Sequence, residues 1–262
     1  MLRPLHEMVA VVTGGSRGIG KGIALALGEA GAVVYVSGRT LHKGSAQWSG
    51  SITETATAIT GLGGRGIAVY CDHHNDGEVA ALFRQVRQEQ GKLDVLVNNA
   101  TSFGLTEDGY PPEEVPFWEL PVAQWDEMHT VGLRSHFVAS ACAAPLMIDR
   151  RNGLIVNISS PGAANYAFNA AYGTAKAGLD KLTADMAHDL RQYNVAVVSL
   201  WPPFTRTEKY LTHPERHDLS RARSPEFTGR AIVGLVTDSK VMEKTGRALR
   251  VTDLANEYAF TD

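Results

Sequence analysis

The 262-residue sequence has few cysteines, no cluster of basic residues and no long apolar run. Its two cysteines, Cys71 and Cys142, lack the spacing of a disulfide framework, so we expect reduced thiols in a cytosolic protein. The net charge of −3, without a run of Lys or Arg, argues against nucleic acid as a partner. No uninterrupted apolar stretch reaches the ~18 residues of a membrane span, and no apolar signal region precedes the first expected strand, so we expect no membrane span.

What the sequence does contain is a regular alternation of strand and helix patterns. Seven runs rich in β-branched residues lie at 8–13, 32–37, 66–71, 93–98, 153–159, 195–200 and 247–251. Most of them are apolar throughout, which is typical of strands covered on both faces. Helical patterns cover 76–90, 122–149 and 171–192. The alternation predicts βαβ units, and therefore one α/β domain over residues 1–262 with a doubly wound, mostly parallel sheet between helices.

Two longer stretches, 101–121 and 202–224, lack a regular pattern. Loops of this length are usually functional, and in a doubly wound fold they lie beyond the carboxyl ends of the strands, where ligands bind. The first stretch contains Tyr110, Phe117 and Trp118, which favours an apolar wall or lid for a lipophilic substrate. Packing on the domain itself or on a partner subunit is the alternative.

A glycine loop, TGGSRGIG at 13–20, joins the first expected strand to a helical pattern. Such a loop lets backbone N–H groups approach a phosphate at the positive end of the helix. Gly14, Gly18 and Gly20 follow the spacing G-x-x-x-G-x-G, which serves the same mechanics as the better-known dinucleotide fingerprint.

The same loop also fits the nucleophile elbow G-x-S-x-G of a hydrolase, with Ser16 as the nucleophile and His213 or His217 as its base. The elbow's oxyanion hole takes an N–H from a loop after an earlier strand. Here the motif follows the first strand, so the topology argues against this alternative.

The second expected strand ends in SGRT, residues 37–40, and no carboxylate stands there for an adenosine ribose hydroxyl. Arg39 together with Arg17 could instead clamp a ribose 2′-phosphate through planar, charged donors. This favours NADP(H) over NAD(H), and two solvated surface arginines are the alternative.

A phenol and an ammonium, Tyr172 and Lys176, lie four residues apart in AAYGTAKAG, with only small residues between them. On a helix these positions share one face. A surface pair is the plain interpretation. The functional one is a general acid whose pKa the ammonium lowers from its usual value of about 10.

Taken together, TGGSRGIG, CDHHNDGEV, NNA, NISS, YGTAK and WPP resemble, in order and spacing, the motifs of the short-chain dehydrogenase/reductase family. Finer similarity, in WDEMHTVGLRSHF and VSLWP, is to the dehydrogenase/reductase family member 1 subgroup. The resemblance implies a Rossmann-type domain with a seven-stranded sheet, a nicotinamide dinucleotide and a homodimer or homotetramer.

The resemblance also implies roles for individual residues. Tyr172 would protonate a carbonyl oxygen, and Lys176 would hold the nicotinamide ribose. Ser160 would bind the substrate oxygen, with Ser159 as second choice because the serine-to-tyrosine spacing is slightly short. The implied cofactor-binding residues are Gly14, Ser16, Arg17, Gly18, Ile19, Gly20, Arg39, Asp72, Asn99, Ala100, Tyr172, Lys176, Pro202 and Thr207.

Some of these positions carry a structural alternative. Asp72 would meet the adenine amino group, or would simply form a turn. Asn98 would secure the sheet. His73 and His74 have no second ligand cluster, so we expect no metal.

Two positions depart from the family pattern. Pro203 stands where the family has Gly and lacks an N–H. Gly132 stands where many members have an Asn of a proton relay, inside a helical pattern where Gly costs about 1 kcal/mol relative to Ala. We expect either a local break in the helix at Gly132 or close packing against the next helix.

The sequence thus predicts an NADPH-dependent carbonyl reductase, reversible as an alcohol dehydrogenase, acting on a lipophilic ketone or aldehyde. Two alternatives stay open. One is the Ser16 hydrolase, and the other is a nucleotide-binding protein with little catalytic activity.

Overall fold

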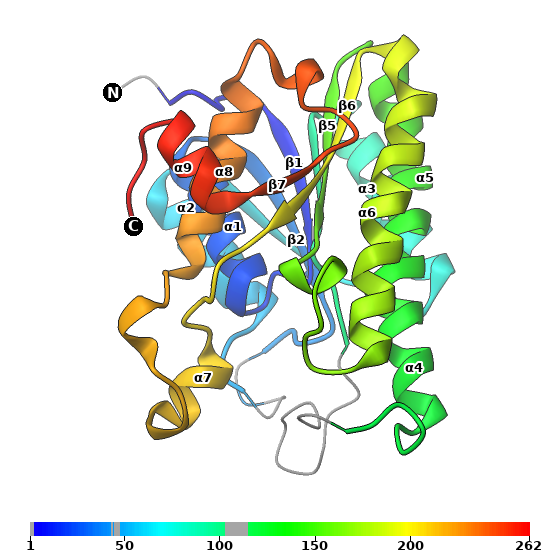
Figure 1. Cartoon of the computed structure of the whole chain (residues 1–262). Helices are drawn as coiled ribbons and strands as arrows, with labels where there is room; N and C mark the ends of the chain where they lie inside the picture. Colours follow the sequence, from blue (N-terminus) through cyan, green and yellow to red (C-terminus); the bar gives the residue numbers. More distant parts are fainter. Residues whose placement is uncertain (1–2, 43, 45–47, 103–114) are drawn as a thin grey trace.

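The computed structural model describes residues 3–42, 44, 48–102 and 115–262. Within them, seven parallel strands form one sheet in the order β3-β2-β1-β4-β5-β6-β7 (Figure 1). The strands are β1 (Val9–Thr13), β2 (Val33–Gly38), β3 (Arg65–Tyr70), β4 (Val95–Asn98), β5 (Gly153–Ile158), β6 (Val195–Trp201) and β7 (Ala248–Arg250). The predicted Rossmann-type fold is confirmed.

Helices cover both faces of the sheet (Figure 1). One layer contains α1 (Gly18–Glu29), α2 (Ile52–Leu62), α8 (Pro225–Thr237) and α9 (Val251–Glu257). The other contains α3 (Asp76–Gln90), α5 (Ser135–Ile148) and α6 (Ala170–Leu190). The shorter α4 (Val122–His129) and α7 (Glu208–Thr212) lie near the end of the sheet at which β1 and β4 terminate.

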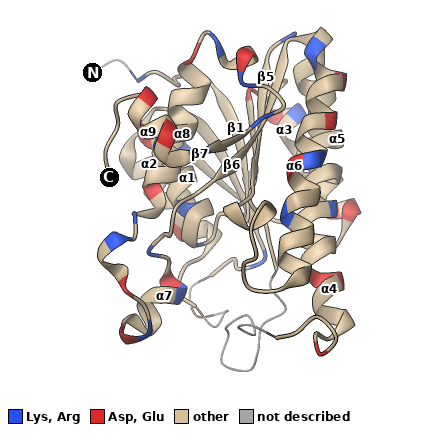
Figure 2. Ribbon diagram, viewed as in Figure 1, with Lys and Arg blue, Asp and Glu red and all other residues tan. Residues whose placement is uncertain are grey.

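Two apolar cores, one on each side of the sheet, follow from the alternation of side chains along the strands. On β1, Ala10 and Val12 pack toward α1 and α8. Val9 and Val11 pack toward α3 and α5. Because both faces are covered, the central strands are apolar at nearly every position, and Figure 2 shows the charged residues on the outer helices and loops. The edge strands β3 and β7 are less buried.

The expected long helix at 122–149 is interrupted. A π-helical turn at Thr130–Arg134 separates α4 from α5, so the predicted break at Gly132 is present. Among the described residues, the run Val122–Ile148 alone is long and apolar enough to cross a membrane by length and composition, with 50% of its window buried inside the protein. A core helix passes the same test, and α5 packs on α3 and β4.

Several helices were not singled out from the sequence. These are α2, α8 and α9. The stretch 202–224 was expected to be irregular, which is partly wrong, because it contains α7 and two 3₁₀ turns, Pro214–Arg216 and Leu219–Arg221.

Candidate active site

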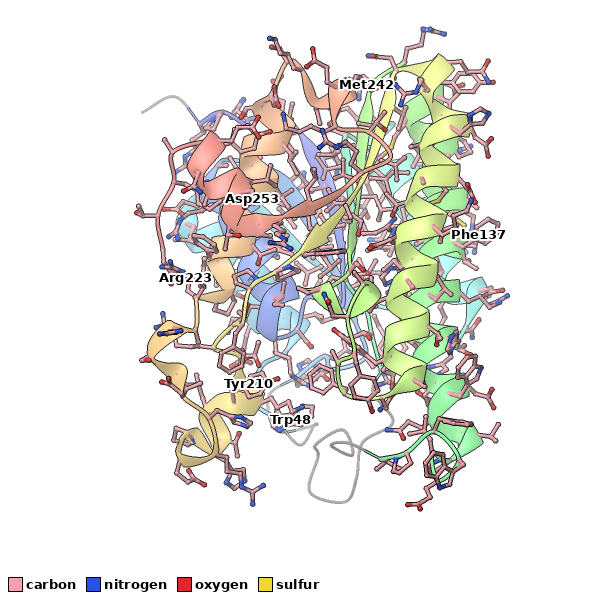
Figure 3. All side chains as sticks on the ribbon, viewed as in Figure 1. Trp48, Phe137, Tyr210, Arg223, Met242 and Asp253 are labelled. Carbon is pink, nitrogen blue, oxygen red and sulfur yellow. The ribbon has the colours of Figure 1, made fainter. Side chains whose placement is uncertain are left out.

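One cavity of about 760 Å³ opens beyond the carboxyl ends of the strands. Trp48 and Tyr210, which line it, lie at this end of the molecule in Figure 3. The cavity brings together every residue that the sequence assigned to catalysis or cofactor binding: Gly14, Ser16, Arg17, Gly18, Ile19, Gly20, Arg39, Asp72, Asn99, Ala100, Ser160, Tyr172, Lys176, Pro202 and Thr207.

The glycine loop is shaped by contacts that a side chain would block. Gly14 has a positive φ of 66°, and a Cβ on it would lie 2.9 Å from the Ala100 Cα. A Cβ on Gly20 would lie 2.3 Å from Asn99 Nδ2 and 2.4 Å from the Gly14 carbonyl oxygen. The glycines therefore let the loop fold tightly over the start of α1 and leave its surface open toward the cavity.

Asn99 and Thr13 hold the glycine loop in place. Asn99 Nδ2 donates to the carbonyl oxygens of Thr13 and Gly14, at 2.9 and 3.1 Å. Thr13 Oγ1 accepts from the backbone N–H groups of Asn99 and Ala100, at 2.9 and 3.0 Å. The Asn99 side chain, expected to bind cofactor, is thus engaged with the loop itself. Thr13 was not identified from the sequence.

The two arginines share the adenosine end of the cavity. Arg17 donates through one nitrogen to Thr40 Oγ1 at 3.0 Å and to the Gly50 carbonyl at 3.1 Å. Burial lowers the pKa of Arg17, the Glu208 carboxylate opposes that shift, and the positive charge of Arg39 adds to it. Arg17 is thus part-buried and not a solvated surface residue, whereas Arg39 is exposed.

Tyr172 and Lys176 are both buried, so the interpretation as a surface pair is wrong. Their exposed fractions are 7% and 5%. They lie on the first turns of α6. Asn169 caps the start of this helix, and its side chain accepts from the Tyr172 backbone N–H at 3.0 Å. Lys176 Nζ lies 5.9 Å from the centre of the Tyr172 ring and donates to the Ile158 carbonyl at 2.9 Å.

The geometry distinguishes the two candidate serines at the end of β5. Ser160 hydrogen-bonds the Tyr172 side chain, and its Oγ accepts from the Gly162 backbone N–H at 2.9 Å. Ser159 is buried and donates to the Lys176 carbonyl at 3.3 Å. Ser160 is therefore the serine placed beside the phenol.

The pKa of Tyr172 differs from the sequence expectation. Burial raises it, and the Ser160 hydrogen bond opposes this shift. We expected Lys176 to lower the pKa of Tyr172. For the chain by itself this expectation is wrong, because desolvation is the largest cause of the pKa shift at Tyr172 and at Lys176. Burial also lowers the pKa of Lys176 to about 8, which Asp180 partly opposes.

Asp72 forms a turn at the adenosine end of the cavity. Its Oδ1 accepts from the His74 backbone N–H and contacts His74 Nδ1, each at 3.0 Å. His74 Nε2 lies 3.0 Å from Glu127 Oε1. Burial lowers the pKa of His74, but the two carboxylates outweigh it and the net pKa is raised. The turn interpretation thus accounts for Asp72, and among the described residues no group of three His, Cys, Asp or Glu could hold a metal.

The aromatic side chains of the cavity come from elements other than expected. Trp48, Phe168, Phe204 and Tyr210 line it. Phe117 and Trp118, with 69% and 72% of their surface exposed, pack edge to face on each other at 5.3 Å and do not line the cavity. The expectation that these two form its wall is wrong, and Tyr110 lies outside the described residues.

Comparison with known proteins agrees with this geometry. The family model described as short chain dehydrogenase matches residues 8–217. The chain belongs to the short-chain dehydrogenase/reductase family. It is 41% identical to dehydrogenase/reductase SDR family member 1 of mouse and of human, over all of this chain and 85% of each relative, which places it with that subgroup. It is 32% identical to a 3-oxoacyl-[acyl-carrier-protein] reductase of Synechocystis, over 94% of this chain and 96% of the relative. A solved short-chain type dehydrogenase/reductase from Mycobacterium marinum superimposes with a TM-score of 0.79 at 26% identity, covering 95% of both chains.

Membership of the short-chain dehydrogenase/reductase family makes the protein an oxidoreductase that uses a nicotinamide cofactor. The hydrolase alternative is not favoured, since Ser16 lies within the loop that the family uses for its dinucleotide. Asn98 has the structural role that the family resemblance implied. Its Nδ2 donates to Ser140 Oγ and Asn157 Oδ1, each at 2.9 Å, and so ties β4 to β5 and α5.

The position where many short-chain dehydrogenases/reductases have Asn is occupied here by Gly132 in the π-helical turn. A Cβ on Gly132 would lie 3.3 Å from Thr101 Oγ1 and 3.4 Å from Met128 Sδ. The alternative of close packing against the next helix does not describe Gly132, because the atoms nearest to an added Cβ belong to the Thr101 and Met128 side chains. One turn later, buried His136 contacts the Ala100 carbonyl oxygen through Nε2 at 2.9 Å, and burial lowers its pKa to about 3. No motif in the sequence identified His136.

Proposed function

We propose that this family member is an NADP(H)-dependent carbonyl reductase, reversible as an alcohol dehydrogenase. The observation that carries the proposal is the hydrogen bond between Ser160 and Tyr172 beside the buried Lys176, in the same cavity that Arg39 lines. In this arrangement the Tyr172 hydroxyl, as proton donor, and the Ser160 hydroxyl can both hydrogen-bond the same substrate oxygen.

The cavity has features that fit a dinucleotide. Gly14 and Gly20 leave the backbone bare where any Cβ would collide with neighbouring atoms. At the start of α1 the Gly18 N–H donates to the Glu208 carboxylate, which shows that an anion can be held there, where the helix dipole favours negative charge. When bound, the dinucleotide would supply or accept the hydride.

The chain's own residues would move and guide the proton. Because the Gly162 N–H occupies a lone pair of Ser160 Oγ, the Ser160 hydroxyl proton is directed toward the Tyr172 oxygen or a substrate oxygen beside it. Tyr172 Oη would give its proton to the carbonyl oxygen in reduction and take it back in oxidation. Lys176, held by the Ile158 carbonyl, would keep positive charge beneath the phenol and favour its ionised form as the proton leaves.

The choice of NADP(H) over NAD(H) is supported by Arg17 and Arg39. Their guanidinium groups act on each other across the adenosine end, so an anion between them would relieve the repulsion. The turn after β2 reads Gly38-Arg39-Thr40 and offers no carboxylate to a ribose hydroxyl.

The substrate end of the cavity supports a lipophilic ketone or aldehyde. Phe204 packs edge to face on Tyr210 at 4.9 Å, and Phe168 packs on Tyr172 in the same way at 4.9 Å. All four rings line the cavity. They would bury the apolar part of a substrate whose carbonyl group reaches Tyr172 and Ser160. As in the family generally, we propose a homo-oligomer, dimer or tetramer.

The proposal is tested by mixing the protein with NADPH or NADH and a panel of ketones, aldehydes and quinones that differ in apolar bulk. We expect loss of reduced-nicotinamide absorbance with NADPH, faster for the more apolar carbonyl compounds. Ester cleavage without nucleotide would favour the Ser16 hydrolase. Tight nucleotide binding without turnover of any carbonyl compound would favour a binding protein and contradict the reductase.

A further inference from the structure

Helix α1 receives its N-terminal acceptor from a residue far away in the sequence. Glu208 Oε2 accepts a hydrogen bond from the Gly18 backbone N–H at 2.7 Å, across a sequence separation of 190 residues. The helix has no cap of its own, because the Arg17 side chain makes no capping bond and the first turn contains no acidic residue. The Glu208 carboxylate therefore satisfies one of the N–H groups that a helix start leaves without a partner.

Glu208 reaches this position from the first residue of α7, directly after Thr207. The Thr207 methyl group packs close to Gly18, since a Cβ on Gly18 would lie 3.4 Å from it. The negative charge of Glu208 also acts on Arg17, whose pKa it raises against the effect of burial. Both Glu208 and Thr207 line the cavity. The carboxylate thus lies in the electropositive corner of the cavity that the glycine loop builds.

We infer that Glu208 competes with the cofactor's pyrophosphate for the Gly18 N–H. This inference rests on the proposed function, because it needs a dinucleotide in this cavity. One N–H cannot donate a full hydrogen bond to a carboxylate and to a phosphate at once, and two anions at one helix start repel each other. The carboxylate therefore leaves the Gly18 N–H when the pyrophosphate arrives. Glu208 stabilises the chain without nucleotide and weakens nucleotide binding by the same interaction.

The competition is specific to one part of the ligand. NADPH and NADH share the pyrophosphate, so Glu208 opposes both to a similar degree. Adenosine 2′-monophosphate carries the 2′-phosphate but no pyrophosphate, so it does not compete with Glu208 for the Gly18 N–H, and Glu208 acts on its binding only through the charge of Arg17. The residue thus sets the affinity for dinucleotides as a class and leaves the choice between NADP and NAD to the arginines.

The test compares Glu208→Gln and Glu208→Ala with a matched control, Glu215→Gln. Glu215 lies in the same segment between β6 and α8, pairs with His213 at 3.3 Å and does not line the cavity. Dissociation constants for NADPH, NADH and adenosine 2′-monophosphate are measured by titration calorimetry, and melting temperatures are measured without nucleotide.

We expect both Glu208 variants to bind NADPH and NADH roughly tenfold more tightly, with a clearly smaller gain for adenosine 2′-monophosphate, since an anion at a part-buried helix start is worth about one factor of ten. Without nucleotide, the Ala variant melts below the wild type, and the control matches the wild type in every measurement. Unchanged or weaker dinucleotide binding in the Glu208 variants overturns the inference. An equal gain for adenosine 2′-monophosphate, or the same gain in the control, also overturns it, because it would show a general charge effect. Failure of the wild type to bind either dinucleotide refutes the proposed function, and the competition with it.

Discussion

The burial of Lys176 predicts how the free energy of unfolding depends on pH. Its pKa falls from the ordinary 10.5 to about 8 in the folded chain, with desolvation as the largest cause. Between these two values the unfolded chain binds a proton that the folded chain does not, so the contribution of Lys176 to stability rises as pH increases from 8 to 10.5. Below pH 8 the ammonium is charged in both states, and keeping it buried costs roughly 3 kcal/mol, at ~1.4 kcal/mol per pH unit.

Replacing Lys176 by Met removes this cost and the hydrogen bond to the Ile158 carbonyl. The lost hydrogen bond lowers stability by about 1 kcal/mol or more at every pH, because that carbonyl stays buried. The pH-dependent part is separate from it. We expect the free energy of unfolding of Lys176→Met, relative to the wild type, to fall by about 2 kcal/mol from pH 7 to pH 9.5.

The assay is urea unfolding at both pH values with the protein concentration held constant. Lys181→Met is the matched control, because Lys181 lies on the same helix with 73% of its side chain exposed. Its free energy of unfolding relative to the wild type is expected to stay nearly constant between the two pH values. The reasoning is refuted if the free energy of unfolding of Lys176→Met changes between the two pH values as much as that of the wild type, or if the variant gains stability relative to the wild type at pH 9.5. Either result would mean that the ammonium is not held in a desolvated site.

Three further predictions concern two cavity residues and the π-helical turn at Gly132. Tyr172→Phe removes the proton donor and keeps the ring, so kcat is expected to fall by roughly 10² or more with the Kd for NADPH little changed, and near-normal turnover would contradict the assignment. Arg39→Ala is expected to raise the KM for NADPH by a factor of roughly ten or more while NADH use stays nearly constant, as steady-state kinetics with both nucleotides will show; equal losses would mean that Arg39 does not contact the 2′-phosphate. Gly132→Ala is expected to change the melting temperature little, because its two near neighbours at 3.3 and 3.4 Å are side-chain atoms and Ala favours helix by about 1 kcal/mol. Gly132→Asn is expected to melt lower than Gly132→Ala, and the reverse order would show that the turn holds room for a larger side chain.

The sequence located the parts of the site that depend on local pattern. Apolar runs fixed the seven strands to within a residue or two, since a buried parallel strand needs apolar residues on both faces. The glycine loop and the Tyr172–Lys176 spacing could be recognised in the sequence, because each depends on residues that are only a few positions apart. The cost of Gly in a helix also marked Gly132 as a position that needs a reason, and of the two explanations left open, a break in the helix is the one that the structure shows.

The remaining features depend on contacts between distant segments. Glu208 is an ordinary acidic residue in the sequence, and only the folded chain brings it to Gly18. The pKa of Tyr172 was mispredicted because burial, which a linear pattern does not give, outweighs the nearby charge. Phe117 and Trp118 were expected from their aromatic character to line the cavity, but in the folded chain both side chains are exposed and outside it.

The strand order affects how the chain can fold while it is being synthesised. β1 pairs with β2 on one edge, but its other edge pairs with β4, which begins at Val95. During synthesis the apolar strand VAVVT therefore keeps one edge open until the chain has grown past that point. The Ser160–Tyr172 pair forms later still, because β5 must first pair with β4. Fragments that end before Val95 are thus expected to be prone to aggregation, and the assembled Ser160–Tyr172 pair is expected to mark a late stage of folding.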